Sequence, residues 1–144
     1  MKNLLIVGAC VLYLGCIPVT LAAEQLKLVE HASNETLLDL GAKGDSTGDV
    51  LAFANPVFDA SNKTQVGSTE GYCVRVVVGK SWSCAWTLMI KDGQITVFGI
   101  YQDAGESVLA VTGGTGKYSG AKGQLKLHSR GVNSSAYDFT YEIN

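Results

Sequence analysis

The chain has 144 residues, of which 47% are hydrophobic and 17% charged, and its 11 Lys and Arg against 13 Asp and Glu give a net charge of −2. That length has room for one modest domain. The slightly acidic balance gives no electrostatic reason to bind nucleic acid or an anionic membrane surface, so neither is predicted as a partner.

The first 23 residues have the pattern of a secretory signal peptide. A short basic start at residues 1–3 precedes an apolar run over residues 4–21, and Ala22 and Ala23 supply small residues at its end. We expect cleavage after one of these two alanines. We therefore expect residues 24–144 to be a single secreted or periplasmic domain, with no stable membrane insertion after cleavage.

Two other interpretations of this start remain open. The apolar run of about 18 residues is just long enough to span a bilayer, so it could be a retained anchor. Cys16 could carry a lipid, although Tyr13 stands where such lipidation signals have leucine.

Most of the remaining sequence alternates in the way of β-strands. Residues 33–40 are the exception, and they could hold a short helical turn capped by Ser33 or Asn34. Elsewhere the chain predicts about eight strands joined by glycine-rich turns, the pattern of an antiparallel sandwich or barrel. A closed eight-stranded barrel has an interior that side chains fill or that holds one small ligand. The predicted strands are 24–31, 48–55, 72–78, 82–90, 94–101, 107–111, 123–130 and 136–143.

Two cysteines, Cys73 and Cys84, lie within the predicted domain. Export to an oxidising compartment favours a disulfide, and their separation suits neighbouring strands of one hairpin. The alternative is two reduced cysteines, one of them in a pocket. Trp82 and Trp86 share a strand face with Cys84, so we expect both in the core or in a cavity wall.

A glycine-rich stretch at residues 111–123 first looks like a phosphate-binding loop. Placing Gly116 and Lys117 in the P-loop motif puts Val111 where the first glycine belongs and Tyr118 where Ser or Thr belongs. A strand pattern follows instead of the required helix. We therefore expect a bent connection between two strands and no nucleotide. With only two histidines, we also expect no metal site and no hydrolytic triad.

Several motifs in order resemble the allene oxide cyclase and dirigent superfamily over residues 26–143, nearly all of the predicted domain. These motifs are GDVLAFANPVFD, VGSTEGYCVRV, WSCAWTLMIKDGQITVFGIY, LAVTGGTGKYSGAKGQLKLH and the terminal YDFTYEI. The resemblance implies an eight-stranded antiparallel β-barrel with a central apolar cavity and no metal or organic cofactor. It also implies a homo-oligomer, because the cyclases form trimers and dirigent proteins form dimers or trimers.

Three residues are candidate catalytic groups by this resemblance. Glu30 matches a pocket glutamate of the cyclases, although Ala32 stands where they have an asparagine; its alternative is a strand-end glutamate in solvent. Asn55 matches the F-x-N motif and could hold an epoxide oxygen or a water, or it is a turn residue before Pro56. Tyr101 matches a pocket tyrosine, or it packs in the core.

Three further residues are candidate ligand-binding groups. Phe53 lies on the same strand face as Asn55 and is expected to line the cavity. Cys73 matches a pocket cysteine of the cyclases, but in a disulfide it would act as a staple. Arg75 shares the face of Cys73; if it points inward it needs a partner, for which Glu30 and Glu70 are candidates, and otherwise it lies at the barrel rim.

The resemblance implies that the barrel holds a reactive small molecule in one conformation. We therefore expect an exported barrel that binds a small apolar or phenolic ligand and guides its cyclisation or isomerisation. The alternative is a non-catalytic dirigent-like scaffold or carrier, which controls the stereochemistry of a reaction started by another enzyme. A third interpretation is a plain structural module whose barrel is packed solid.

Overall fold

The computed structural model describes residues 24–131 and 135–144, so the predicted signal peptide lies outside the described residues. Within the described part, no helix is long and apolar enough to cross a membrane. The elements in chain order are β1 Glu24–His31, β2 Glu35–Leu38, β3 Val50–Asp59, β4 Gln65–Val77, β5 Ser81–Ile90, β6 Gly93–Gln102, β7 Ser107–Gly114, the 3₁₀ turn η1 Gly116–Tyr118, β8 Gly123–Ser129 and β9 Ala136–Ile143.

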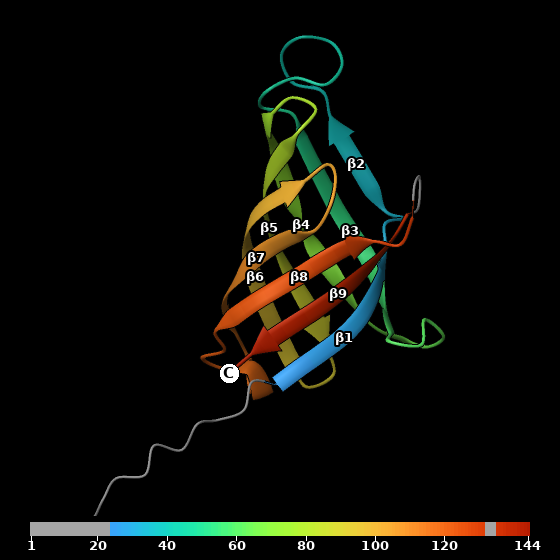
Figure 1. Ribbon diagram of the computed structural model, residues 1–144, viewed down its shortest axis with the longest axis vertical. Coiled ribbons are helices and arrows are strands. Elements are labelled where there is room, and N and C mark those ends of the chain that lie inside the picture. Colours follow the sequence, from blue (N-terminus) through green and yellow to red (C-terminus); the bar gives the residue numbers. More distant parts are fainter. Residues whose placement is uncertain (1–23, 132–134) are drawn as a thin grey trace, which may run out of the picture.

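Eight of these strands close into an antiparallel barrel (Figure 1). Each strand from β3 to β8 pairs with the strand that follows it in the chain. β9 pairs with β1, and β1 also pairs with β3, which closes the barrel. The ladder that closes the barrel is short, with the partners Leu28↔Asp59, Val29↔Phe58 and Glu30↔Val57. The predicted fold class is confirmed, and so are strands at all eight predicted positions.

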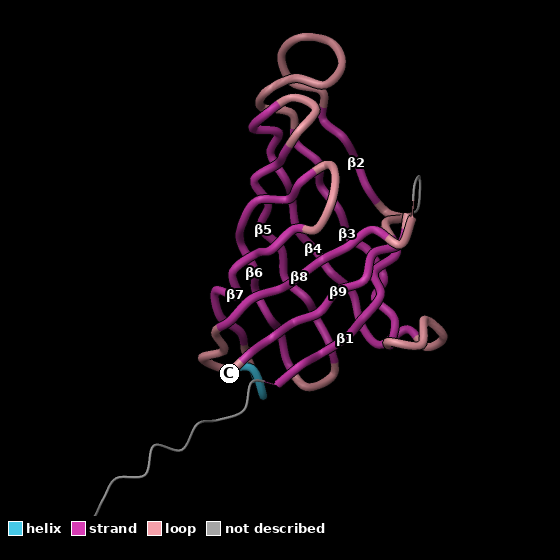
Figure 2. Tube along the Cα trace, viewed as in Figure 1, coloured by secondary structure: helices cyan, strands magenta, loops and turns pink. Residues whose placement is uncertain are grey.

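The helical turn predicted for residues 33–40 is wrong, because this segment contains strand β2. It pairs antiparallel with the first half of β3, from Glu35↔Phe53 to Leu38↔Val50. Since β1 covers only the far end of β3, the first half of β3 has backbone groups that need partners, and β2 supplies them. Figure 2 shows β2 alone beside β3 at this end of the barrel.

Alternating side chains of the barrel strands form one buried core. The inward face of a strand carries every second residue, so the period-two pattern of the sequence becomes an apolar interior. The most buried members of this core are Val57, Cys84, Leu88, Ile95, Leu109, Leu125 and Tyr141.

Gly71 and Gly99 leave room for larger neighbours on the adjacent strands. A Cβ at Gly71 would lie 2.3 Å from the Cβ of Trp86, and one at Gly99 would lie 3.0 Å from the Cα of Leu109. Any larger residue at position 71 would therefore clash with the side chain of Trp86.

The glycine-rich stretch 111–123 is the bent connection between β7 and β8 that the sequence predicts. Gly116 has φ 60°, and a Cβ there would lie 2.5 Å from the carbonyl oxygen of Asp92. The backbone N–H of Lys117 donates to the same oxygen at 2.9 Å. Glycine at residue 116 thus lets this connection pack closely against the turn between β5 and β6.

Candidate functional site

A pocket of about 110 Å³ lies among inward-facing side chains of seven strands. It is smaller than the roughly 300–1,000 Å³ typical of ligand sites, so a single ring fits and a larger ligand requires side chains to move. The lining residues are Glu35, Leu51, Phe53, Cys73, Trp86, Tyr101, Leu127, Tyr137 and Phe139.

Aromatic rings make up much of this lining and contact one another. The ring of Trp86 lies between those of Phe53 and Phe139, with centroid distances of 6.0 and 5.9 Å. The rings of Tyr101 and Tyr137 meet edge to face at 6.3 Å. Such contacts hold the walls in place and present flat apolar surfaces to a ligand.

Glu30 points into the barrel from β1 and is only 6% exposed. The Thr69 hydroxyl donates to its Oε2, and the Asn55 Nδ2 donates to its Oε1 at 3.3 Å. Burial raises the pKa of this carboxyl from 4.5 to about 7, while those two hydrogen bonds oppose the rise and the charge of Glu35 adds to it. Both protonation states are therefore populated near neutral pH, and the interpretation of Glu30 as a solvent-exposed strand end is wrong.

Asn55 joins the inside of the barrel to the corner between β1 and β2. Its Oδ1 accepts the backbone N–H groups of Ser33 at 3.1 Å and Asn34 at 3.0 Å. Its Nδ2 donates to Glu30 and also to Oε1 of Glu35 at 3.4 Å. Because Asn55 lies within β3 and is 1% exposed, it is a buried link between two carboxyl groups and not a turn residue.

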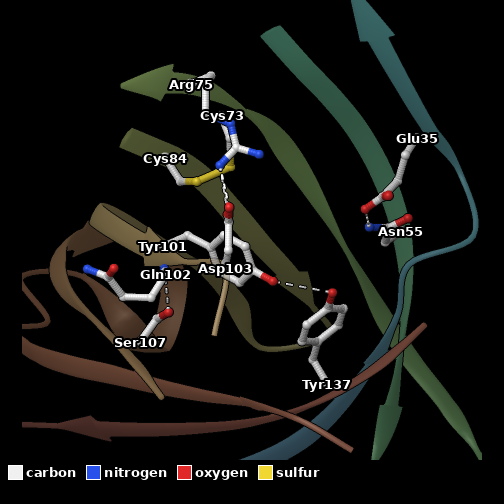
Figure 3. The surroundings of a disulfide bond; sticks show 10 residues. All are labelled: Glu35, Asn55, Cys73, Arg75, Cys84, Tyr101, Gln102, Asp103, Ser107 and Tyr137. Carbon is white, nitrogen blue, oxygen red and sulfur yellow. Dashed lines mark hydrogen bonds and ion pairs between the residues drawn. A yellow bond between two sulfur atoms is a disulfide. The ribbon is translucent and has the colours of Figure 1, made fainter. Parts of the chain in front are cut away.

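Tyr101 lines the pocket at the end of β6, where its hydroxyl lies 3.4 Å from that of Tyr137. Figure 3 shows these two hydroxyls turned toward each other. Burial, the neighbouring Tyr137 and the charges of Asp103 and Glu35 raise the pKa of Tyr101 above its ordinary value. The phenol therefore stays protonated and able to donate a hydrogen bond.

The predicted disulfide between Cys73 and Cys84 is confirmed. The two residues face each other on β4 and β5, and Figure 3 shows the bond between their sulfur atoms. Cys73 lines the pocket together with Phe53. Neither is a free thiol, so at residue 73 the pocket wall is a disulfide.

Arg75 is buried, but the partners predicted for it are wrong. Its Nε donates to Asp45 Oδ1 at 2.6 Å, and its Nη1 donates to both oxygens of Asp103 at 2.8 and 2.7 Å. Its guanidinium carbon lies 3.9 Å from the centre of the Trp82 ring. Glu30 and Glu70 make none of these contacts, and Arg75 is not among the pocket-lining residues.

Sequence reasoning missed several polar groups of this interior. Glu35 lies in the segment predicted as a helical turn, and its place at the pocket follows from its pairing with Phe53, although it is largely exposed. The buried Trp86 indole N–H and Tyr141 hydroxyl lie close together without a hydrogen bond of normal geometry, and this contact opposes the rise in the Tyr141 pKa that burial causes. A bound acceptor or a water molecule would satisfy the indole. Among the described residues, no cluster of His, Cys, Asp or Glu is arranged to hold a metal ion.

The fold also occurs in solved structures with other chemistry. Pyocyanin demethylase is 23% identical, with a TM-score of 0.75 over 84% of this chain and 100% of its own. The pterocarpan synthase dirigent protein GePTS1 is 15% identical, with a TM-score of 0.74 over 91% and 96% of the two chains. The exo-specific intermolecular Diels-Alderase AbnU is 13% identical, with a TM-score of 0.60 over 83% and 98%. At these identities the likeness establishes the barrel alone.

The sequence itself gives the closer assignment. The family model for allene oxide cyclase matches residues 24–140, which is the whole described barrel apart from its last four residues. Proteins of the allene oxide cyclase and dirigent-like barrels bind small molecules and catalyse cyclisations or guide stereochemistry. The chain belongs to the allene oxide cyclase family.

Proposed function

We propose that this protein binds a small apolar or phenolic molecule in its aromatic pocket and guides that molecule's cyclisation or isomerisation. The observation that carries the proposal is the buried Glu30 carboxyl, whose pKa is raised to about 7. It lies behind the pocket lining, where its cross-strand neighbour Tyr137 belongs to the lining and Asn55 connects it to Glu35.

Each part of the pocket has a role in such a reaction. The rings of the lining hold the substrate in one conformation and exclude water, which favours ring closure over hydrolysis. The protonated hydroxyl of Tyr101 donates a hydrogen bond to an oxygen of the substrate. The ionised Glu30 stabilises positive charge that develops as the ring closes. No atom is gained or lost, because a cyclisation of this kind is an isomerisation.

Binding is the first test of the proposal. Phenols and unsaturated fatty acids are titrated into the protein while tryptophan fluorescence is followed, since Trp86 lines the pocket. We expect saturable quenching by at least one class. The absence of saturable binding by every member would overturn the proposal and favour a purely structural module.

Turnover is the second test, and it uses a matched pair of variants. Glu30→Gln removes the buried charge, and Glu70→Gln removes an exposed charge from the same barrel. With an unsaturated epoxide that cyclises spontaneously, we expect the wild type and E70Q to give one enantiomer in excess. We expect E30Q to be slower by a factor of about 10² to 10³, as when one preorganised electrostatic group is removed. Equal rates in all three proteins would refute the role of Glu30.

The disulfide favours a second candidate function, a dirigent-like scaffold or carrier. With Cys73 bonded to Cys84, the pocket lacks the free cysteine that the cyclase resemblance implies. A scaffold would bind its ligand without turnover. It would bias stereochemistry only when a separate oxidase generates the reactive species, and E30Q would leave that bias unchanged.

We also propose that residues 1–23 direct export and that the mature barrel self-associates. The disulfide supports an oxidising compartment. Exposed apolar side chains on neighbouring strands support self-association, namely Tyr72, Phe98, Ile100 and Val108. Mass spectrometry of the secreted protein should show a chain beginning at residue 23 or 24, and light scattering should show a dimer or trimer. A full-length, monomeric product would contradict both parts.

A further inference from the structure

The charges that face the pocket have a single sign. Among the described residues that line it, Glu35 is the only charged one. Glu30 lies behind the lining and shares the Asn55 amide with Glu35. Asp103 and Glu35 both raise the pKa of Tyr101, so their negative charge reaches the Tyr101 hydroxyl in the pocket wall.

The nearest buried cation does not offset this negative field. The Arg75 guanidinium is bound by two carboxylates, Asp45 at 2.6 Å and Asp103 at 2.7 Å, so this group of three carries net negative charge. The face of Trp82 covers the guanidinium as well. Arg75 is therefore not available to pair with an anionic ligand.

The aromatic lining adds to the same preference. Rings of five residues surround the pocket, and the negative faces of aromatic rings attract cations. Proteins bind quaternary ammonium and similar cations in cages of aromatic rings. In this pocket the Glu35 carboxylate adds a negative charge to such a set of rings. A carboxylate ligand would lose its water shell here without gaining a positively charged partner.

We propose that this pocket selects its ligand by charge, accepting cationic and neutral ring compounds and rejecting carboxylates, with Glu35 as the specificity-determining residue. The favoured class is a single ring that carries positively charged nitrogen. The proposal rests on the proposed function in one respect, that the pocket is the ligand site. It narrows the ligand panel above, because free fatty acids become the weakest members.

Three probes of nearly equal size test the proposal: 1-methylpyridinium, toluene and benzoate, which differ in charge. The chain has two tryptophans, so the NMR spectrum has two indole N–H signals. The signal of Trp86 is the reporter because this residue lines the pocket. A Trp82→Phe variant assigns it.

We expect titration with 1-methylpyridinium to shift the Trp86 signal with a Kd about tenfold lower than the Kd for toluene. Cation–π attraction and the exposed Glu35 carboxylate together account for a difference of this size. Benzoate should bind at least about tenfold more weakly than toluene. Glu35→Gln should raise the Kd for 1-methylpyridinium about fivefold and leave toluene unchanged. Glu70→Gln, the same change on the outer wall, should alter neither.

Two results would overturn the charge proposal and differ in what they say of the proposed function. If toluene binds and the charged probes bind equally well, charge selection is refuted and the pocket remains a ligand site. If no probe moves the Trp86 signal, the pocket does not take ring compounds, and both proposals are refuted. An unchanged cation affinity in E35Q would remove the role of Glu35.

Discussion

Arg75 and Glu30 are both buried charged residues, and they differ in how their charge is compensated. Arg75 has two carboxylates within 2.7 Å and an aromatic face above it. Glu30 has only the Thr69 hydroxyl and a long contact to the Asn55 amide, with no cation among its partners. The first arrangement stabilises charge, whereas the second leaves the Glu30 carboxyl with a pKa near 7.

The two groups also differ in what they connect. Arg75 connects β4 to Asp45 in the loop before β3 and to Asp103 after β6, so it holds loops over one end of the barrel. Asp45 also accepts the backbone N–H of Gly79 in the β4–β5 turn. Glu30 connects no loops, and in the proposed function its charge acts on the ligand.

The largest expected effect comes from breaking the compensated group. Arg75→Met keeps much of the side-chain volume but leaves two aspartates without their cation, and we expect a loss of about 4 kcal/mol in the free energy of unfolding, as for a broken buried pair. Urea denaturation measures it. The double variant R75M/D103N should recover part of the loss. A loss below about 1 kcal/mol would mean that the group behaves like a surface ion pair.

The second effect is a pH dependence of stability that comes from Glu30. The Glu30 carboxyl has a pKa of about 7 in the folded protein against an ordinary value of 4.5. Its stabilising contribution is complete below pH 4.5 and is lost as the pH rises through 7, by up to about 3 kcal/mol. We expect the stability difference between wild type and E30Q, measured in urea, to change by this amount between pH 4.5 and 8. A constant difference would contradict the raised pKa.

A third effect concerns the disulfide that joins β4 to β5. Replacing both Cys73 and Cys84 by alanine should lower the unfolding free energy by about 2 kcal/mol, because the closed loop is short. The pH dependence that comes from Glu30 should persist in this variant. Loss of this pH dependence would mean that the disulfide is needed to keep Glu30 buried.

The smallest expected effect concerns the hydrogen bond from the Thr69 hydroxyl to Glu30. The Thr69 hydroxyl favours the ionised carboxyl, so Thr69→Val should raise the Glu30 pKa further above 7. We expect a cost of about 1.5 kcal/mol at pH 8 and a smaller one at pH 5, where the carboxyl is protonated. Thr87→Val on the outward face of β5 is the matched control. Equal costs at both pH values would show that Thr69 does not sense the charge.

The sequence alone predicts much of the barrel because strand alternation is a local property. Period two placed Phe53 and Asn55 on one strand face, and the spacing of the two cysteines agreed with one hairpin. The partners of Arg75 escaped prediction, because Asp45 and Asp103 lie 30 and 28 residues away in loops without periodicity. Glu35 escaped because a free edge of β3, and not local propensity, made its segment a strand.

The short ladder between β1 and β3 has a consequence for the order of folding. β1 is the first described strand of the chain, yet its longest ladder is with β9, the last one, from Glu24↔Ile143 to His31↔Ala136. β1 therefore cannot form its longest ladder until β9 has been synthesised. Pairing across so large a sequence separation is slow, and until it forms both β1 and β9 have open edges. The chain is most exposed to aggregation in the interval before its two ends meet.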